Sequence, residues 1–208
     1  MNTGNNFLDR LLLTKDFYRN ITDKKPGLYI GIILVGMIDL LAPMIDKFSR
    51  IFVGKTQTVL CYNIILTALF IILIGLVDVL FFSLPLFDLF KVFKKEVEVQ
   101  SSSRLLVKIM KIQIVANLLV FIPSILVYIL NKNVDIGEYP FIGEIIFILS
   151  ILIFIWYCAA ISRGINSIYS FKPVYRMWVF NVVFLWAFIL SNFSISYVID
   201  NLMIGLFK

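Results

Sequence analysis

Long apolar runs separated by short charged stretches constrain this chain more than any other feature of its sequence. Of its 208 residues, 61% are hydrophobic, and the mean hydropathy is +0.96. A soluble domain is nearer half apolar, and its buried core would show shorter apolar runs. The pattern predicts an all-α fold, an integral membrane bundle with short loops and no room for a large soluble domain.

Five of these runs are each about long enough to cross roughly 30 Å of hydrocarbon. Pro85 lies near the end of the second run, where it could kink or stop a helix, and Pro123 lies within the third. We expect a tail at residues 1–26 and a transmembrane domain at residues 27–208. The expected spans are residues 28–45, 58–84, 105–130, 141–161 and 177–198.

The tail does not resemble a cleavable signal peptide, because its only apolar patch is three leucines next to charged residues. In residues 6–22, apolar side chains fall near one side of a helix and most charged ones fall elsewhere. This spacing predicts an amphipathic helix on the membrane surface, with a flexible polar tail as the alternative.

The distribution of lysine and arginine predicts the orientation. Fourteen of the 19 lie in the tail, around the loop between spans two and three, or in the loop between spans four and five. The positive-inside rule therefore places the N-terminus in the cytoplasm and the C-terminus outside the cell membrane. Setting topology is a sufficient role for these charges, but they could also bind anionic lipid headgroups or another membrane protein. No nucleic-acid partner is expected.

Several polar residues lie inside the predicted spans, and an intramembrane carboxylate is by default a candidate functional group. Counted at the helical rise, Asp39 lies about 16 Å and Asp78 about 9 Å from the inner edge. Lys111 matches the depth of Asp78 and could pair with it, or it could extend to the lipid headgroups instead. Gln113 and Asn117 share one helix face and match the depth of Asp39. Amide–carboxyl contacts of this kind contribute about 0.6 kcal/mol each, which is typical of structural packing.

The two aspartates occur in similar heptapeptides, "VGMIDLL" in the first span and "IGLVDVL" in the second. In each, a glycine lies three residues before the aspartate and so on the same helix face. Such a glycine would let a neighbouring backbone approach, with the carboxyl beside the contact. Chance similarity between apolar helices is an equally good explanation.

The chain has no histidine, which excludes serine–histidine and cysteine–histidine catalysis and histidine metal motifs. Cys61 and Cys158 are expected on opposite sides of the bilayer, too far apart for a disulfide, and cannot form a four-thiolate site. The motifs of intramembrane aspartyl proteases are not met. No enzyme activity and no cofactor are therefore expected. A small proton- or ion-coupled transporter that uses the buried carboxylates is the alternative function.

Two segments carry a resemblance to a known family. Residues 11–21 read "LLLTKDFYRNI", and the fourth span continues into its loop as "WYCAAISRGINSIYSF". The first resembles the short helix before the first span, and the second resembles the fourth span and its following turn, in bacterial members of the Yip1-domain family. Richness in Ile, Phe, Lys and Asn is also typical of an AT-rich bacterial genome. The resemblance implies a non-enzymatic protein of membrane organisation or vesicle transport, acting through contacts with small GTPases and other membrane proteins.

Overall fold

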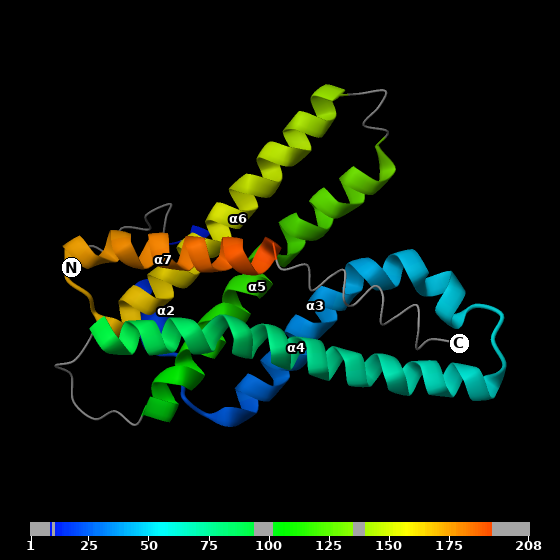
Figure 1. Cartoon of the computed structure of the whole chain (residues 1–208), viewed down its shortest axis with the longest axis horizontal. Helices are drawn as coiled ribbons and strands as arrows, with labels where there is room; N and C mark the ends of the chain where they lie inside the picture. Colours follow the sequence, from blue (N-terminus) through cyan, green and yellow to red (C-terminus); the bar gives the residue numbers. More distant parts are fainter. Residues whose placement is uncertain (1–8, 10, 94–101, 135–139, 193–208) are drawn as a thin grey trace.

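The computed structural model describes residues 9, 11–93, 102–134 and 140–192 of the chain. These residues form helices joined by short loops, with no strand in the described part (Figure 1). Five helices are long and apolar enough to cross a membrane, which confirms the predicted all-α bundle and indicates a multi-pass membrane protein. The helices are α2 (Lys15–Arg19), α3 (Lys25–Phe52), α4 (Gln57–Phe93), α5 (Ser102–Asn133), α6 (Pro140–Tyr169) and α7 (Pro173–Asn192).

The long helices extend beyond the predicted spans. Helix α4 continues through Pro85 to Phe93, so this proline does not end it. The turns after Pro85 are held by packing, because Leu86, Phe87 and Phe90 are buried in the main core. Residues 193–198 of the fifth predicted span lie outside the described residues.

The main hydrophobic core lies toward one end of the bundle. It joins the C-terminal parts of α4 and α6 to the N-terminal half of α5 and to most of the length of α7. Away from this end, the α3–α4 pair and the α5–α6 pair point in different directions (Figure 1). The bundle is therefore packed most completely on the side of the C-terminal ends of α4 and α6. Core residues include Phe82, Leu86, Phe90, Ile109, Ile112, Ile161, Ile165 and Val183.

The N-terminal segment differs from the continuous helix predicted over residues 6–22. Residues 1–8 and 10 lie outside the described residues, and the chain is not helical from Leu12 to Thr14. Leu13 has φ 61°, and the Thr14 hydroxyl caps the short helix α2 by accepting from the Phe17 N–H at 3.2 Å. The prediction of one amphipathic helix is wrong, because a left-handed residue and a new N-cap interrupt it.

This segment also packs on protein. Tyr18 of α2 is fully buried in the main core, where Leu12, Leu13 and Ile21 pack against it from the same segment. Helix α2 lies against α6. Among the described residues of the predicted apolar side, Leu12, Tyr18 and Ile21 therefore face the bundle.

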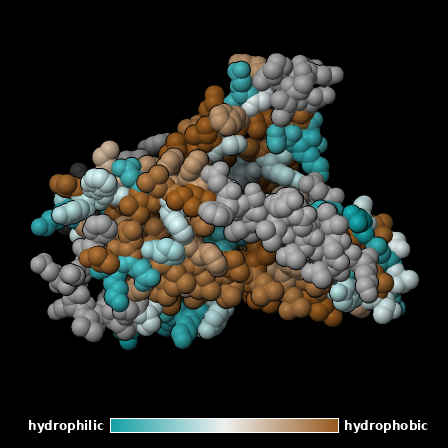
Figure 2. Space-filling view, in the orientation of Figure 1, coloured by the Kyte–Doolittle hydropathy of each residue, from teal (hydrophilic) through white to brown (hydrophobic). Residues whose placement is uncertain are grey.

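The outer surface of the long helices is apolar. Figure 2 shows a continuous hydrophobic area over the middle of the molecule, with hydrophilic residues gathered at its ends. Many large apolar side chains of the long helices are more than half exposed, such as Ile65, Phe81, Ile122 and Phe147. A surface of this kind is stable in lipid, and water would not solvate it well.

Candidate functional site

The Gln113 side chain, fully buried on α5, joins α5 to α4 through both ends of its amide. Its Nε2 donates to Oδ2 of Asp78 at 2.9 Å, and its Oε1 accepts from Oγ of Ser83, also at 2.9 Å. Asp78 and Ser83 lie on successive turns of α4, and Ser83 is also fully buried. A single amide thus satisfies a hydroxyl and a carboxylate that would otherwise be costly inside the bundle.

Three further side chains complete this group. The Asn117 amide, one turn beyond Gln113, interacts with the Asp78 carboxyl. The Asp39 carboxyl on α3 interacts electrostatically with that of Asp78. The Tyr157 hydroxyl on α6 interacts with the Gln113 side chain and with both carboxyls. We call the resulting set the polar cluster, and it consists of Asp39, Asp78, Ser83, Gln113, Asn117 and Tyr157.

A close crossing of α3 and α4 brings the two carboxyls into range of each other. A Cβ added at Gly36 would lie 1.9 Å from the backbone oxygen of Ile71, and one added at Gly75 would lie 2.0 Å from that of Ile32. The two helix backbones therefore touch at these glycines, in a locally symmetric way. Asp39 and Asp78 each follow their glycine by three residues, so each leaves the crossing on the same face of its helix.

The crossing agrees with the interpretation of the two similar heptapeptides as a glycine contact. In both heptapeptides the glycine allows backbone approach and the aspartate lies beside it. A seven-residue similarity by chance does not require the two segments to meet, and here they do. The repeated segment is thus a packing motif of the α3–α4 pair.

The polar cluster differs from the pairings predicted from depth. Gln113 donates to Asp78, whereas depth had matched it to Asp39. Lys111 does not join the cluster: its Nζ donates to the backbone oxygen of Thr22 at 2.7 Å and lies 3.3 Å from the Thr22 hydroxyl. Lysine at this position reaches toward the N-terminal segment and away from the centre of the bundle.

Ser83 and Tyr157 were missed by sequence reasoning. Each is a single polar side chain in an apolar run, "FFSLP" and "IWYCA". The chemistry of Gln113 does indicate such partners, because a buried amide needs an acceptor for its N–H groups and a donor for its oxygen. A carboxylate supplies only the acceptor, so the amide oxygen needs a donor, such as a hydroxyl group, from another residue.

A second group of polar contacts attaches the N-terminal segment to α6. The indole Nε1 of Trp156 donates to the backbone oxygen of Leu11 at 2.8 Å, and Arg163 forms an ion pair with Asp9. Burial raises the pKa of Tyr18 to about 12, although the nearby Arg163 charge opposes this rise. The Tyr18 hydroxyl is therefore neutral at physiological pH, as its place in the core requires.

The described residues contain no group of three or more His, Cys, Asp or Glu side chains that could hold a metal ion. Comparisons with protein-family models, curated proteins and solved structures gave no match. Functional inference for this chain therefore rests on its own chemistry and geometry.

Proposed function

We propose that this multi-pass membrane protein is a non-enzymatic, Yip1-type protein of membrane organisation or trafficking that acts through contacts with lipids or other membrane proteins. The observation that carries the proposal is the pair of hydrogen bonds made by the Gln113 side chain. Its Nε2 donates to Asp78 and its Oε1 accepts from Ser83, so both ends of the amide have partners inside the bundle. The polar cluster thereby holds α4 and α5 together. The apolar outer surface of the helices is the part left available for partners.

The chemistry of the polar cluster supports a structural role. Ser83 donates its proton to an amide oxygen, which is too weak a base to generate an alkoxide nucleophile. The chain has no histidine that could act as a general base. The proposed site of action is the cell membrane of a bacterium, with the N-terminus cytoplasmic and the C-terminus outside, as the charge distribution favours.

A proton- or ion-coupled transporter is the second candidate, and one observation favours it. The Asp39 and Asp78 carboxyls interact across the α3–α4 crossing, so two ionisable groups lie together inside the bundle. Such groups in membrane proteins often mark ion pathways. The amides of Gln113 and Asn117 favour the structural role for Asp78. Both hydrogen-bond to its carboxyl and so offset the cost of burying that group.

A flux assay in proteoliposomes distinguishes the two candidates. Wild-type protein, Asp39→Asn and the matched control Glu144→Gln, which changes an exposed carboxylate on α6, are reconstituted with internal pH-sensitive and sodium-sensitive dyes. We expect all three membranes to be as tight to protons and sodium as empty liposomes. Flux that Asp39→Asn abolishes and Glu144→Gln retains would establish the transporter and refute the structural role.

A further inference from the structure

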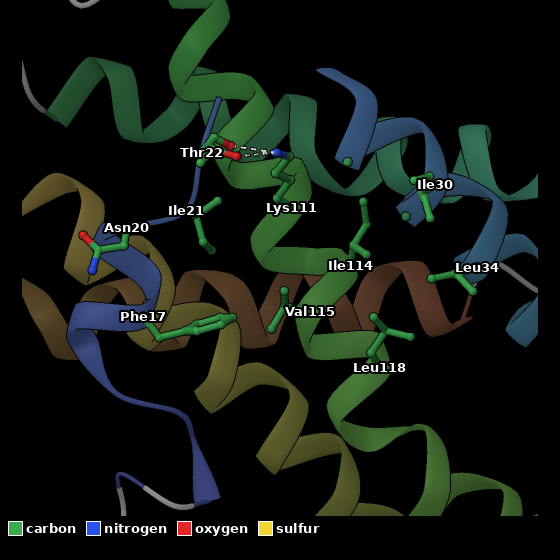
Figure 3. Close-up of a pocket in the computed structure, with 12 residues that line it drawn as sticks. Phe17, Asn20, Ile21, Thr22, Ile30, Leu34, Lys111, Ile114, Val115 and Leu118 are labelled. Carbon is green, nitrogen blue, oxygen red and sulfur yellow. Dashed lines mark hydrogen bonds between the residues drawn. The ribbon is translucent and has the colours of Figure 1, made fainter. Parts of the chain in front are cut away.

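An open groove of about 540 Å³ lies between the N-terminal segment, α3 and α5, outside the polar cluster (Figure 3). Its volume is within the range of about 300–1,000 Å³ found for small-molecule sites. The lining side chains are mostly apolar, with a few polar groups at one end. The groove is lined by Phe17, Asn20, Ile21, Thr22, Gly27, Ile30, Gly31, Leu34, Lys111, Ile114, Val115 and Leu118.

Two glycines one turn apart on α3 shape the floor of this groove. A Cβ at Gly31 would lie 2.6 Å from the Cδ1 atom of Ile114, so the missing side chain lets α5 approach α3. A Cβ at Gly27 would lie 3.4 Å from Nζ of Lys111, which leaves room beside the ammonium group. Ile30, 62% exposed, and Leu118, 40% exposed, remain as apolar walls.

The polar end of the groove is cationic. Lys111 is the one charged side chain among the described residues that line it. An ammonium group has three donors, and the two contacts to Thr22 leave a third for an external oxygen. The nearby acid Asp23 does not cancel this charge, because it forms an ion pair with Arg104 at 3.4 Å.

The groove therefore changes from cationic to apolar along α5. Ile114 lies about one turn and Leu118 about two turns beyond Lys111, which carries the apolar wall roughly 10 Å deeper. Helix α3 begins beside the polar end with the exposed Lys24 and Lys25 and without a side-chain N-cap, so its first turn adds positive potential. The complementary ligand has an anionic head and an apolar chain.

We propose that this groove binds one anionic phospholipid, with its phosphate at Lys111 and Thr22 and an acyl chain along Ile30, Leu34 and Leu118. The proposal rests on the proposed function only for the membrane location of the chain. It assigns Lys111 to a lipid headgroup at the polar end of an apolar groove, in place of the ion pair with Asp78.

The test measures lipid binding by the purified full chain in mild detergent, by native mass spectrometry. The probes are dioleoyl phosphatidylglycerol, dioleoyl phosphatidylcholine and inorganic phosphate. Lys111→Met removes the charge and keeps an apolar stem, Lys111→Arg keeps the charge, and Leu118→Trp fills the groove. The matched controls are Lys108→Met, one turn earlier on α5 and outside the groove lining, and Leu126→Trp, an exposed position further along α5.

We expect Lys111→Met to weaken phosphatidylglycerol binding about 5-fold, the value for losing one lysine contact near a headgroup. Lys111→Arg and both control variants should bind it like the wild type, and Leu118→Trp should weaken it by the same factor or more. Inorganic phosphate should bind far more weakly, because it lacks the acyl chain. Equal affinity for phosphatidylcholine, equal loss in Lys108→Met, or unchanged binding in Leu118→Trp would each overturn the site.

Two further outcomes keep the conclusion separate from the proposed function. A chain that integrates into membranes but shows no effect of Lys111→Met overturns the lipid site and leaves the proposed function standing. A chain that does not integrate overturns both. If Lys111→Met loses helix content by circular dichroism, the lipid site is tested instead by comparing phosphatidylglycerol binding to Leu118→Trp and to its control Leu126→Trp.

Discussion

Among the individual residues of the polar cluster, Gln113 links α5 to α4 through two side-chain hydrogen bonds. Replacing it with leucine removes the donor to Asp78 and the acceptor for Ser83. We expect Gln113→Leu to lower the free energy of unfolding by about 1–2 kcal/mol, since each intramembrane hydrogen bond contributes about 0.6 and at most about 1.7 kcal/mol. Titration of mixed micelles with a denaturing detergent, followed by circular dichroism, measures this change.

Ser83→Ala is the control for that variant, because it removes one of the two bonds and keeps the Asp78 contact. Its loss should be about half that of Gln113→Leu if the bonds contribute separately. A Gln113→Leu protein as stable as the wild type would show that the polar cluster does not hold α4 to α5.

The residues of the polar cluster were partly predictable from the sequence. Depth along a span can be counted, and it selected Asp39, Asp78, Gln113 and Asn117, which do lie together. Depth does not give the direction around the helix. Lys111 and Gln113 are two residues apart, about 200° around α5, so they face different surroundings. The ion pair with Lys111 failed for that reason.

At the scale of helices, the crossing at Gly36 and Gly75 determines how α3 meets α4. An added methyl group at either site would lie about 2 Å from a backbone oxygen, so the helices must separate. We expect Gly36→Ala and Gly75→Ala each to lower the free energy of unfolding by about 1–3 kcal/mol, as overpacking does. The same detergent titration measures it.

Gly27→Ala is the matched control on α3, because its Cβ would meet the flexible end of Lys111 at an ordinary 3.4 Å. It should be neutral or stabilising, since alanine is the better helix former. If Gly36→Ala were equally harmless, the backbones could not be in contact at this crossing.

The N-terminal segment shows what an amphipathic pattern leaves open. The pattern identifies an apolar side, but a membrane surface and a protein surface can both cover it. Here Tyr18 enters the core, and Trp156 and Arg163 of α6 bind the segment before it. These contacts join residues about 150 positions apart, and the local spacing of apolar residues carries no information about them.

For the whole molecule, the sequence was sufficient to predict five apolar helices, because length and hydropathy decide that much. It did not predict that the core gathers at one end of the bundle. That arrangement depends on large side chains such as Phe82 and Phe90 of α4 meeting Tyr169 of α6, from two distant parts of the chain. Their meeting depends on helix crossings, which single-span patterns do not encode.

The topology of the whole molecule gives the last prediction. The α3–α4 loop and the α6–α7 loop are separated by three long helices, so a chain in which all five apolar helices span the membrane has them on opposite sides. From the charge distribution we expect the first loop outside and the second loop in the cytoplasm. In a Cys61→Ala, Cys158→Ala background, Thr56→Cys should react with a membrane-impermeant maleimide in intact cells. Lys172→Cys should react only after the membrane is opened.

The reverse labelling pattern would invert the orientation and place the Lys111 groove in the outer leaflet. Labelling of both sites in intact cells would contradict the five-span topology itself.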